Sequence, residues 1–270
     1  MHLVLPSTTS HKHEALIPTL DLFARLGFTD LDLNLNHIVE RGAGVDEIRS
    51  TLDANDQRVW IASGGWCDFF DEGVKAGETE ASVERQIALA RRLGVDRLRL
   101  FFGRLPFERY TAAASTEAAA GIRRIADRHP EMTLLFENHD GASSRPEVCK
   151  SILEAVDRAN VRLIFDPINF EHRGVRTLDA LTVVQPLIGH VHLKGYVHVR
   201  QGSGGQAGGE FCGFGEGDVD LQPALRALIA GGYRGDFTVE YEGAGDRTLR
   251  LYESVRRARA SLSSLLAPVR

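Results

Sequence analysis

The sequence predicts an α/β fold of the (β/α)8 barrel class, on three observations. Eight short apolar runs recur along the 270 residues. Helical patterns with start and stop signals lie between these runs, which is typical of parallel strands joined by right-handed crossovers. No Pro- or Ser-rich linker divides the chain, so we expect one domain over residues 1–270. Eight such units in this length fit a closed barrel, and an open doubly wound sheet is the alternative.

The expected strands follow from the apolar runs, which are four to six residues long. Runs of this length with turn signals on both sides are typical of buried strands. In chain order the runs are LVLP (3–6), DLDLNL (30–35), RVWIA (58–62), RLRLFF (97–102), TLLFE (133–137), RLIFD (162–166), HVHLK (190–194) and FTVEYE (237–242).

The expected helices are placed by their first and last residues. Glycine just after a helical pattern ends the helix, whereas Ser, Asp or Pro marks its first turn. These signals predict helices over about 14–26 before Gly27, about 82–93 before Gly94, from Ser115, from Pro146, from Asp220 to Gly231, and over about 248–266.

The segment Gly202–Gly217 has an unusual composition, since eight of its sixteen residues are glycine. A dinucleotide-binding fingerprint needs a strand directly before it and a helix directly after it, and neither is evident around GSGGQA. We therefore expect a long loop after the seventh strand, either mobile or serving as a substrate lid.

Composition and charge exclude several classes of protein. Lys plus Arg is 32 and Asp plus Glu is 37, which gives a net charge of −5, and 43% of residues are hydrophobic. This average composition excludes a disordered chain, collagen and a coiled coil. Without a positive field, neither nucleic acid nor an anionic membrane is an expected partner. Three scattered cysteines and the lack of a targeting or membrane-spanning segment favour a cytoplasmic protein with a small-molecule partner.

Four consecutive predicted strands end in residues that can bind a metal ion. The carboxyl ends of barrel strands meet at one mouth, where catalytic groups lie. Buried carboxylates require a compensating cation, and oxygen and imidazole ligands without cysteine suit Mn, Mg or Co better than a thiolate zinc site. The sequence therefore predicts one divalent ion bound by Glu137, Asp166, His192 and Glu240.

Other polar residues near these strand ends have two interpretations each. His139 and His190 either contact the substrate or the metal ligands, or are packed histidines. Lys194 either contacts a substrate or phosphate group, or is a solvated lysine. Glu242 is interpreted as part of a salt bridge at the rim. Trp66 follows the third strand and either forms a wall of the pocket or packs between helices.

At these residues the chain resembles the xylose isomerase-like TIM barrels, in particular the sugar phosphate isomerase/epimerase group with ketose 3-epimerases, hydroxypyruvate isomerase and inosose dehydratase. The resemblance is strongest from Thr133 onward, and it implies the same four metal ligands. Many members have His where this chain has Asn169, a position that would contact the substrate. The motifs are LLFENHDG (134–141), FDPINF (165–170), HVHLKG (190–195) and GEGDVDLQPALRALIAGGYRGDFTVEYEG (215–243).

The expected chemistry is proton transfer next to a carbonyl through a metal-stabilised enediolate. The resemblance implies that Glu137 and Glu240 act as base and acid in an isomerase or epimerase of carbohydrate metabolism, acting on a sugar or sugar phosphate. Manganese is the expected ion, with Mg, Co, Zn or Fe as alternatives, and a homodimer is a family-level expectation. The alternative activity is a dehydratase or lyase acting on a keto-sugar or cyclic polyol, of the inosose or dehydroshikimate dehydratase type.

Two further interpretations are less consistent with the residues. A DNA-repair endonuclease needs metal ligands at nearly all strand ends and a basic rim, but the early strands end in Ser7, Asn34 and Ser63 and the net charge is −5. A metal-free binding protein that retains the barrel is the other.

Overall fold

The computed structural model of the chain describes residues 2–39, 44–199 and 208–266. Eight parallel strands form its main sheet, in the order β1-β10-β7-β6-β5-β4-β3-β2. A parallel bridge between Ser7 and Asp32 brings the two edge strands together, so the sheet curls into a nearly closed barrel. The strands are β1 (Val4–Pro6), β2 (Asp30–Asn34), β3 (Arg58–Ser63), β4 (Arg97–Phe101), β5 (Thr133–Glu137), β6 (Val161–Phe165), β7 (Ile188–Leu193) and β10 (Phe237–Val239). The barrel prediction is confirmed.

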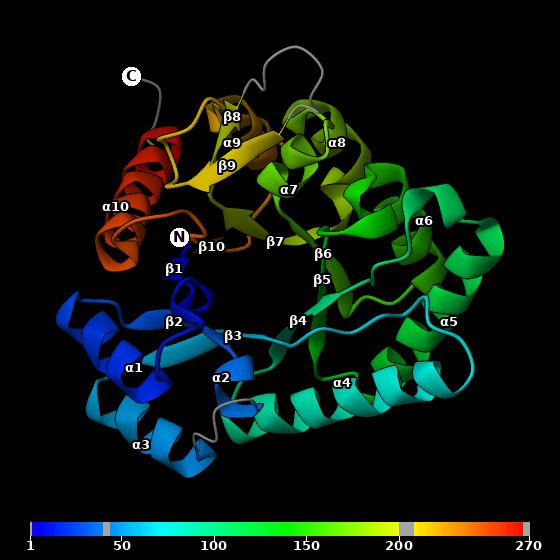
Figure 1. Cartoon of the computed structure of the whole chain (residues 1–270), viewed down its shortest axis with the longest axis horizontal. Helices are drawn as coiled ribbons and strands as arrows, with labels where there is room; N and C mark the ends of the chain where they lie inside the picture. The colour runs from blue at the N-terminus through cyan, green and yellow to red at the C-terminus, as the bar shows by residue number, and fades with distance from the viewer. Residues whose placement is uncertain (1, 40–43, 200–207, 267–270) are drawn as a thin grey trace.

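Helices surround the barrel and cover the outer face of the sheet (Figure 1). They are α1 (Leu16–Arg25), α2 (Asn36–Val39), α3 (Val45–Ala54), α4 (Val74–Arg92), α5 (Ala112–Arg128), α6 (Pro146–Val156), α7 (Pro167–His172), α8 (Thr177–Val184), α9 (Gln222–Ala230) and α10 (Arg247–Leu266). Gly27 and Gly94 end α1 and α4 with φ angles of 77° and 74°, which are left-handed values that favour glycine. Among the described residues, no helix has the length and apolarity needed to cross a lipid bilayer.

Two predicted helix starts were wrong by several residues. The helix expected from Ser82 begins at Val74, directly after Gly73 with its φ of 60°. The helix expected from Ser115 begins at Ala112, because the Thr111 side chain accepts a hydrogen bond from the Ala114 amide and so caps an earlier turn. The start at Pro146 is confirmed.

The loop predicted over Gly202–Gly217 was also wrong in part. Residues Gly208–Cys212 form β9, which pairs antiparallel with β8 (Gly195–Val199), with Tyr196 opposite Phe211. Glycine is needed within this hairpin, because a side chain at Gly209 would collide with the Tyr196 ring and the Val197 carbonyl. The glycines therefore permit close strand pairing here. Residues 202–207 lie outside the described part of the chain.

The barrel interior changes from apolar to polar along the strands. Leu5, Ile61, Leu135 and Ile164 form a separate buried cluster contributed by β1, β3, β5 and β6. Side chains alternate along a strand, so Glu137 points to the same side as Leu135, but nearer the carboxyl end of β5. The apolar layer thus supports a polar layer at the barrel mouth.

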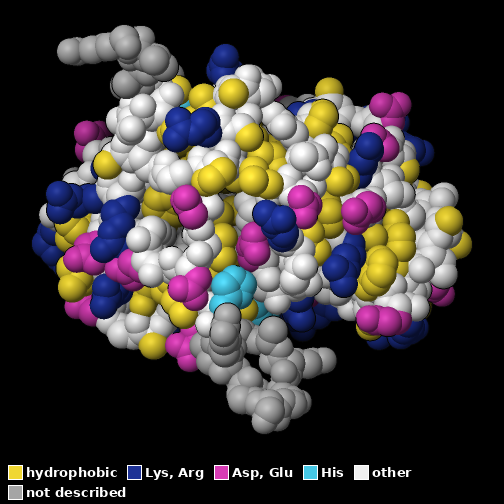
Figure 2. Space-filling view, turned by 90° about the horizontal axis from the view of Figure 1, so that it is seen from above, with side chains coloured by type: hydrophobic (Ala, Val, Ile, Leu, Met, Phe, Trp, Pro, Cys, Tyr) yellow, Lys and Arg dark blue, Asp and Glu magenta, His cyan; other side chains and the backbone are white. Residues whose placement is uncertain are grey.

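On the face of the molecule shown in Figure 2, basic and acidic side chains lie next to one another.

Candidate metal centre

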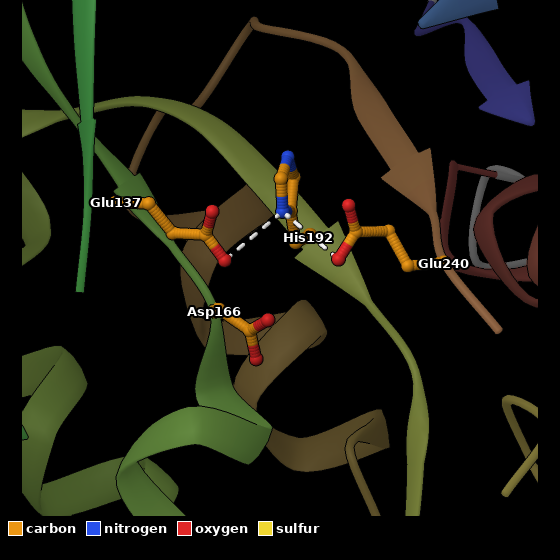
Figure 3. Close-up of side chains that lie close together, drawn as sticks. All are labelled: Glu137, Asp166, His192 and Glu240. Carbon is orange, nitrogen blue, oxygen red and sulfur yellow. Dashed lines mark ion pairs between the residues drawn. The ribbon is translucent and has the colours of Figure 1, made fainter. Parts of the chain in front are cut away.

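The four predicted ligands come together at the carboxyl ends of four neighbouring strands. Glu137 ends β5, Asp166 follows β6, His192 lies in β7 and Glu240 follows β10. One ligand atom from each lies within 4.8 Å of the others, and all four side chains are buried. Figure 3 shows the His192 ring between the carboxylates of Glu137 and Glu240, with Asp166 beside them. The prediction that these residues converge is therefore confirmed.

The His192 ring is surrounded by carboxylate oxygens. Its Nδ1 lies 3.4 Å from Glu137 Oε1 and 3.6 Å from Glu240 Oε2. Within the described ranges, neither ring nitrogen of His192 has a hydrogen-bond partner, although the side chain is fully buried. Buried nitrogen atoms without partners are costly, and three carboxylates beside one imidazole leave an excess of negative charge. The residues present therefore fit a divalent cation with oxygen and nitrogen ligands.

Asp166 caps a helix, and its own backbone is held by a neighbouring side chain. Its Oδ1 accepts hydrogen bonds from the Ile168 and Asn169 amides at 2.9 and 3.0 Å, which caps the start of α7. The Asn138 side chain holds the Asp166 backbone through two hydrogen bonds, each 2.8 Å long. The capping interaction uses only Oδ1, and Oδ2 lies 3.0 Å from Lys194 Nζ, within the cluster of proposed ligands.

The two glutamates experience opposite electrostatic environments. Burial raises the pKa of Glu240 to about 7, and the positive charges of His192 and Lys194 offset this only in part. Burial alone would also raise the pKa of Glu137, but His192 and Arg99 outweigh burial and hold this pKa well below its ordinary value. Burial disfavours the charged form of His192, yet Glu240 and Glu137 raise its pKa to about 9.

Lys194 lies among the acidic residues, fully buried. Its Nζ is 3.0 Å from Asp166 Oδ2 and 2.7 Å from Glu242 Oε2. Although burial opposes its charge, Asp166 and Glu242 hold the pKa of Lys194 well above its ordinary value. Lys194 therefore offsets part of the negative charge around the site. Glu242 also approaches Lys12 at 3.9 Å, so the predicted rim salt bridge exists and extends to a buried partner.

The remaining predicted contact residues separate into two groups. His139 and Trp66 line the barrel mouth, with ring centroids 6.3 Å apart. Asn169 instead donates from Nδ2 to Glu137 Oε1 at 3.2 Å and to the Asn138 carbonyl at 2.9 Å, so it holds a proposed ligand. His190 is buried two residues before His192, on the same side of β7, and its Nε2 is 2.8 Å from Thr238 Oγ1. Burial lowers the pKa of His190 well below its ordinary value, which keeps it neutral.

Two charged residues at the mouth were missed by the sequence analysis. Asp32 in β2 is fully buried, accepts a hydrogen bond from Ser63 Oγ at 2.6 Å, and lies 3.9 Å from His192 Nε2. Arg99 in β4 is 4% exposed, and its Nη1 lies 3.7 Å from Glu137 Oε2. The alternating patterns DLDLN and RLRLF contained the signal, because they place charges at every second position of buried strands.

A cavity of about 270 Å³ opens at the mouth, next to the proposed ligands. Cavities for drug-sized ligands measure about 300–1,000 Å³, so this one suits a smaller molecule. A larger cavity of about 580 Å³, lined in part by α4, contains none of the four proposed ligands. The residues around the mouth cavity are Thr9, Lys12, Asn34, Asn36, Gly64, Trp66, Arg99, Phe101, Arg104, Glu137, His139, Glu240 and Glu242.

The fold and site define a (β/α)8 barrel with a candidate divalent-metal centre at its mouth. The chain belongs to the xylose isomerase-like TIM barrel family, whose family model matches residues 20–265. The resemblance stated from the sequence is thereby confirmed.

A curated relative shares part of the sequence. An inosose dehydratase from Geobacillus thermodenitrificans (strain NG80-2) is 31% identical over 134 residues, which cover 45% of this chain and 45% of the relative. The chain thus matches less than half the length of this relative.

Solved structures share the fold over nearly the whole chain. A xylose isomerase-like TIM barrel protein from Mycobacterium smegmatis in complex with magnesium has a TM-score of 0.80 at 18% identity, covering 99% of this chain and 98% of that one. The IOLI protein with a zinc atom has a TM-score of 0.75 at 18% identity and covers 98% of each chain. A D-tagatose 3-epimerase-like protein has a TM-score of 0.76 at 15% identity, again covering 98% of each. The family includes isomerases or epimerases and dehydratases.

Proposed function

We propose that the protein is a divalent-metal-dependent isomerase or epimerase acting on a sugar or sugar phosphate. The observation that carries this proposal is the position of two carboxylates, Glu137 and Glu240, on either side of His192. The cavity beside them is about 270 Å³, which suits a small molecule. A D-tagatose 3-epimerase-like protein of the same fold is consistent with this activity.

Glu137, Asp166, His192 and Glu240 would hold the ion. When bound, a divalent ion supplies Lewis-acid stabilisation of negative charge on a substrate oxygen. We propose manganese, with Mg, Co, Zn or Fe as alternatives, because carboxylate oxygens and one imidazole nitrogen form the ligand set. Similar barrels have been solved with magnesium and with zinc.

The proton transfer itself is assigned to the two glutamates. Glu137 is kept ionised by His192 and Arg99, so it can take a proton from the carbon next to the substrate carbonyl. Glu240 lies on the other side of His192 from Glu137, so an oxygen of Glu240 that does not hold the ion could return the proton. Two carboxylates that flank the reacting carbon can act as base and acid in turn. Return to the same carbon gives an epimer, and return to the adjacent carbon gives an isomer.

A second candidate function is a dehydratase or lyase acting on a keto-sugar or cyclic polyol. The sequence similarity to an inosose dehydratase over 134 residues favours it. The first proton transfer is the same, and the two reactions differ in whether a hydroxyl group beside the reacting carbon then leaves as water.

The experiment is incubation of the manganese-loaded protein in deuterated water with a panel of ketoses, keto-sugars and inososes. Deuterium uptake next to the carbonyl without loss of water supports the isomerase or epimerase, and a dehydrated product supports the second candidate. Metal content is measured in parallel. A folded protein that takes up no divalent ion after repletion contradicts both functions.

A further inference from the structure

Arg99 is a buried guanidinium next to the candidate metal centre. It lies in the middle of β4, is 4% exposed, and borders the mouth cavity. Its Cζ lies 4.3 Å from the centre of the Phe101 ring, which covers one face of the guanidinium plane. Only the edges of the plane, where the N–H groups point, remain available for hydrogen bonds.

The hydrogen-bonding capacity of Arg99 is largely unused. The closest carboxylate oxygen, Glu137 Oε2, is 3.7 Å from Nη1, which is an ion-pair distance but too long for a hydrogen bond. Among the described residues, Arg99 Nε has no partner. Glu137 is already held from its other oxygen by Asn169 and faces His192. A buried guanidinium with free donors beside a cavity is suited to an anion that arrives with the substrate.

Aromatic residues fix the position of Arg99. The Phe101 ring stacks on Trp66, with centroids 4.7 Å apart. The Cζ of Arg104, which is exposed, lies 3.9 Å from the centre of the Trp66 ring. The His139 ring meets Phe101 edge-on at 5.0 Å. This stack of Arg99, Phe101, Trp66 and Arg104 forms one wall of the cavity. Because it leaves Arg99 little freedom, binding an anion there costs little side-chain entropy.

We propose that Arg99 binds a carboxylate group of the substrate, so that the substrate is a hydroxy or keto acid of the sugar-acid or cyclic polyol-acid type. The reaction assumed here is the proton transfer of the proposed function. The binding of an anion is argued separately, from the stack of Arg99, Phe101, Trp66 and Arg104. Arg99 is close to Glu137, so the carboxylate lies near the reacting carbon rather than at the far end of the substrate.

The surroundings of Arg99 favour a carboxylate over a phosphate. A carboxylate carries one negative charge, and a single guanidinium can bind both its oxygens. A phosphate dianion needs more positive charge, yet among the other basic side chains around the cavity Lys12 and Arg104 are exposed, and His139 lies 3.2 Å from the Asp140 carboxylate. Lys12 also pairs with Glu242. The buried carboxylates of Glu137 and Glu240 would further repel a dianion at this depth.

The experiment measures the dissociation constants of D-gluconate, D-glucitol and D-glucitol 6-phosphate by calorimetry. Gluconate has a carboxylate at the carbon where glucitol has a neutral CH2OH group. The wild-type protein is compared with Arg99→Gln, Arg99→Lys and Arg104→Gln, each in chelator-treated and manganese-loaded forms so that binding to the ion is separated from binding to Arg99. Arg97→Gln is the matched control, because Arg97 lies on the same strand but pairs with Asp236.

We expect the chelator-treated wild type to prefer gluconate over glucitol by about 10- to 100-fold, as charge-assisted hydrogen bonds to arginine are strong. Arg99→Gln should remove this preference and leave glucitol binding within about twofold, while Arg99→Lys should retain part of it. Arg97→Gln should behave as wild type.

Three results would overturn the proposal. The wild type could bind gluconate and glucitol equally, or Arg99→Gln could weaken both probes to the same extent, which would mean that Arg99 only positions Glu137. A preference for the phosphate that Arg104→Gln abolishes would place the anion at the outer end. Deuterium exchange into neutral ketoses with no carboxylate preference would leave the proposed function intact, whereas lack of metal uptake would contradict the function alone.

Discussion

The two halves of the barrel present different chemistry at the same mouth. The second half, β5, β6, β7 and β10, supplies all four proposed metal ligands. The first half, β1 to β4, supplies Asp32 and Arg99 together with neutral strand-end residues such as Ser7, Asn34 and Ser63. In the proposed function the two halves divide the work, because the second half would hold the reacting groups and the first half would surround and orient them.

The hydrogen bonds of the two halves differ in the same way. In the first half the neutral strand-end groups are paired: Ser63 donates to Asp32 at 2.6 Å, and Asn34 donates to Thr9 at 3.2 Å, while Asp32 Oδ2 and Arg99 Nε lack a partner among the described residues. In the second half His192 faces two carboxylates at ion-pair distances of 3.4 and 3.6 Å and has no hydrogen-bond partner among the described residues. A satisfied network is stable by itself, whereas an unsatisfied one gains most from a bound ligand.

The largest effect should come from the second half. Glu240→Gln keeps the shape of the side chain but cannot carry an exchangeable carboxyl proton. We expect it to reduce substrate deuterium exchange by about 10²- to 10⁴-fold, the usual contribution of a general acid or base. Exchange is measured by mass spectrometry on manganese-loaded protein whose metal content has been determined.

Glu253→Gln is the matched control for this change, since Glu253 lies in α10 and pairs with Arg250 and Arg257 on the surface. It should exchange deuterium at the wild-type rate. A Glu240→Gln protein that binds the ion and exchanges at an unchanged rate would remove Glu240 from the proton transfer.

A smaller effect is expected from the first half. Asp32 faces His192 Nε2 at 3.9 Å, on the side of the ring opposite the two glutamates. A carboxylate behind a metal-binding histidine orients the ring, and its loss typically lowers metal affinity about 10- to 100-fold. Asp32→Asn should show this loss in calorimetric titration with Mn²⁺. Asp30→Asn is the control, because Asp30 lies on the same strand but accepts a hydrogen bond from Trp60; equal loss in both variants would contradict an orienting role.

The pH dependence of metal binding connects the two halves. An ion needs neutral His192 and ionised Glu240, and the surrounding charges and burial raise their pKa values to about 9 and about 7. Between about pH 7 and pH 9 Glu240 is already ionised, and His192 must lose one proton for each ion bound. The affinity should therefore rise about tenfold per pH unit in this range and level off above it. Asp32 contributes to the raised pKa of His192. Asp32→Asn should therefore move the upper limit of this rise to lower pH, which calorimetry at a series of pH values would measure.

The convergence of the proposed ligands could be predicted from the sequence because their position follows from local information. Glu137 and Glu240 terminate apolar runs, and parallel barrel strands bring such ends together whatever the details of packing. Asp32 and Arg99 were missed because they lie within runs interpreted as buried strands. Only the closed barrel reveals that alternate residues of those strands face a polar mouth.

The interpretation of Lys194 could not be settled from the sequence for a different reason. Its partners Asp166 and Glu242 are 28 and 48 residues away, so the ion pairs depend on how β6, β7 and β10 pack. The β8–β9 hairpin was obscured because glycine weakens the alternating pattern by which a strand is recognised.

The smallest effect is expected at Asn169, and it should show whether this residue positions Glu137 or contacts the substrate. Asn169 donates to Glu137 Oε1 at 3.2 Å and to the Asn138 carbonyl at 2.9 Å, so its side chain fixes Glu137. A typical hydrogen bond contributes about 0.5–1.5 kcal/mol, so Asn169→Ala should lower deuterium exchange by about two- to tenfold. Asn169→His introduces the residue that the sequence resemblance implies for many relatives, can still donate, and should retain most of the rate. Because Asn169 acts on Glu137, the loss should appear in kcat with KM little changed. A rise in KM alone would instead assign Asn169 to the substrate, as the sequence had suggested.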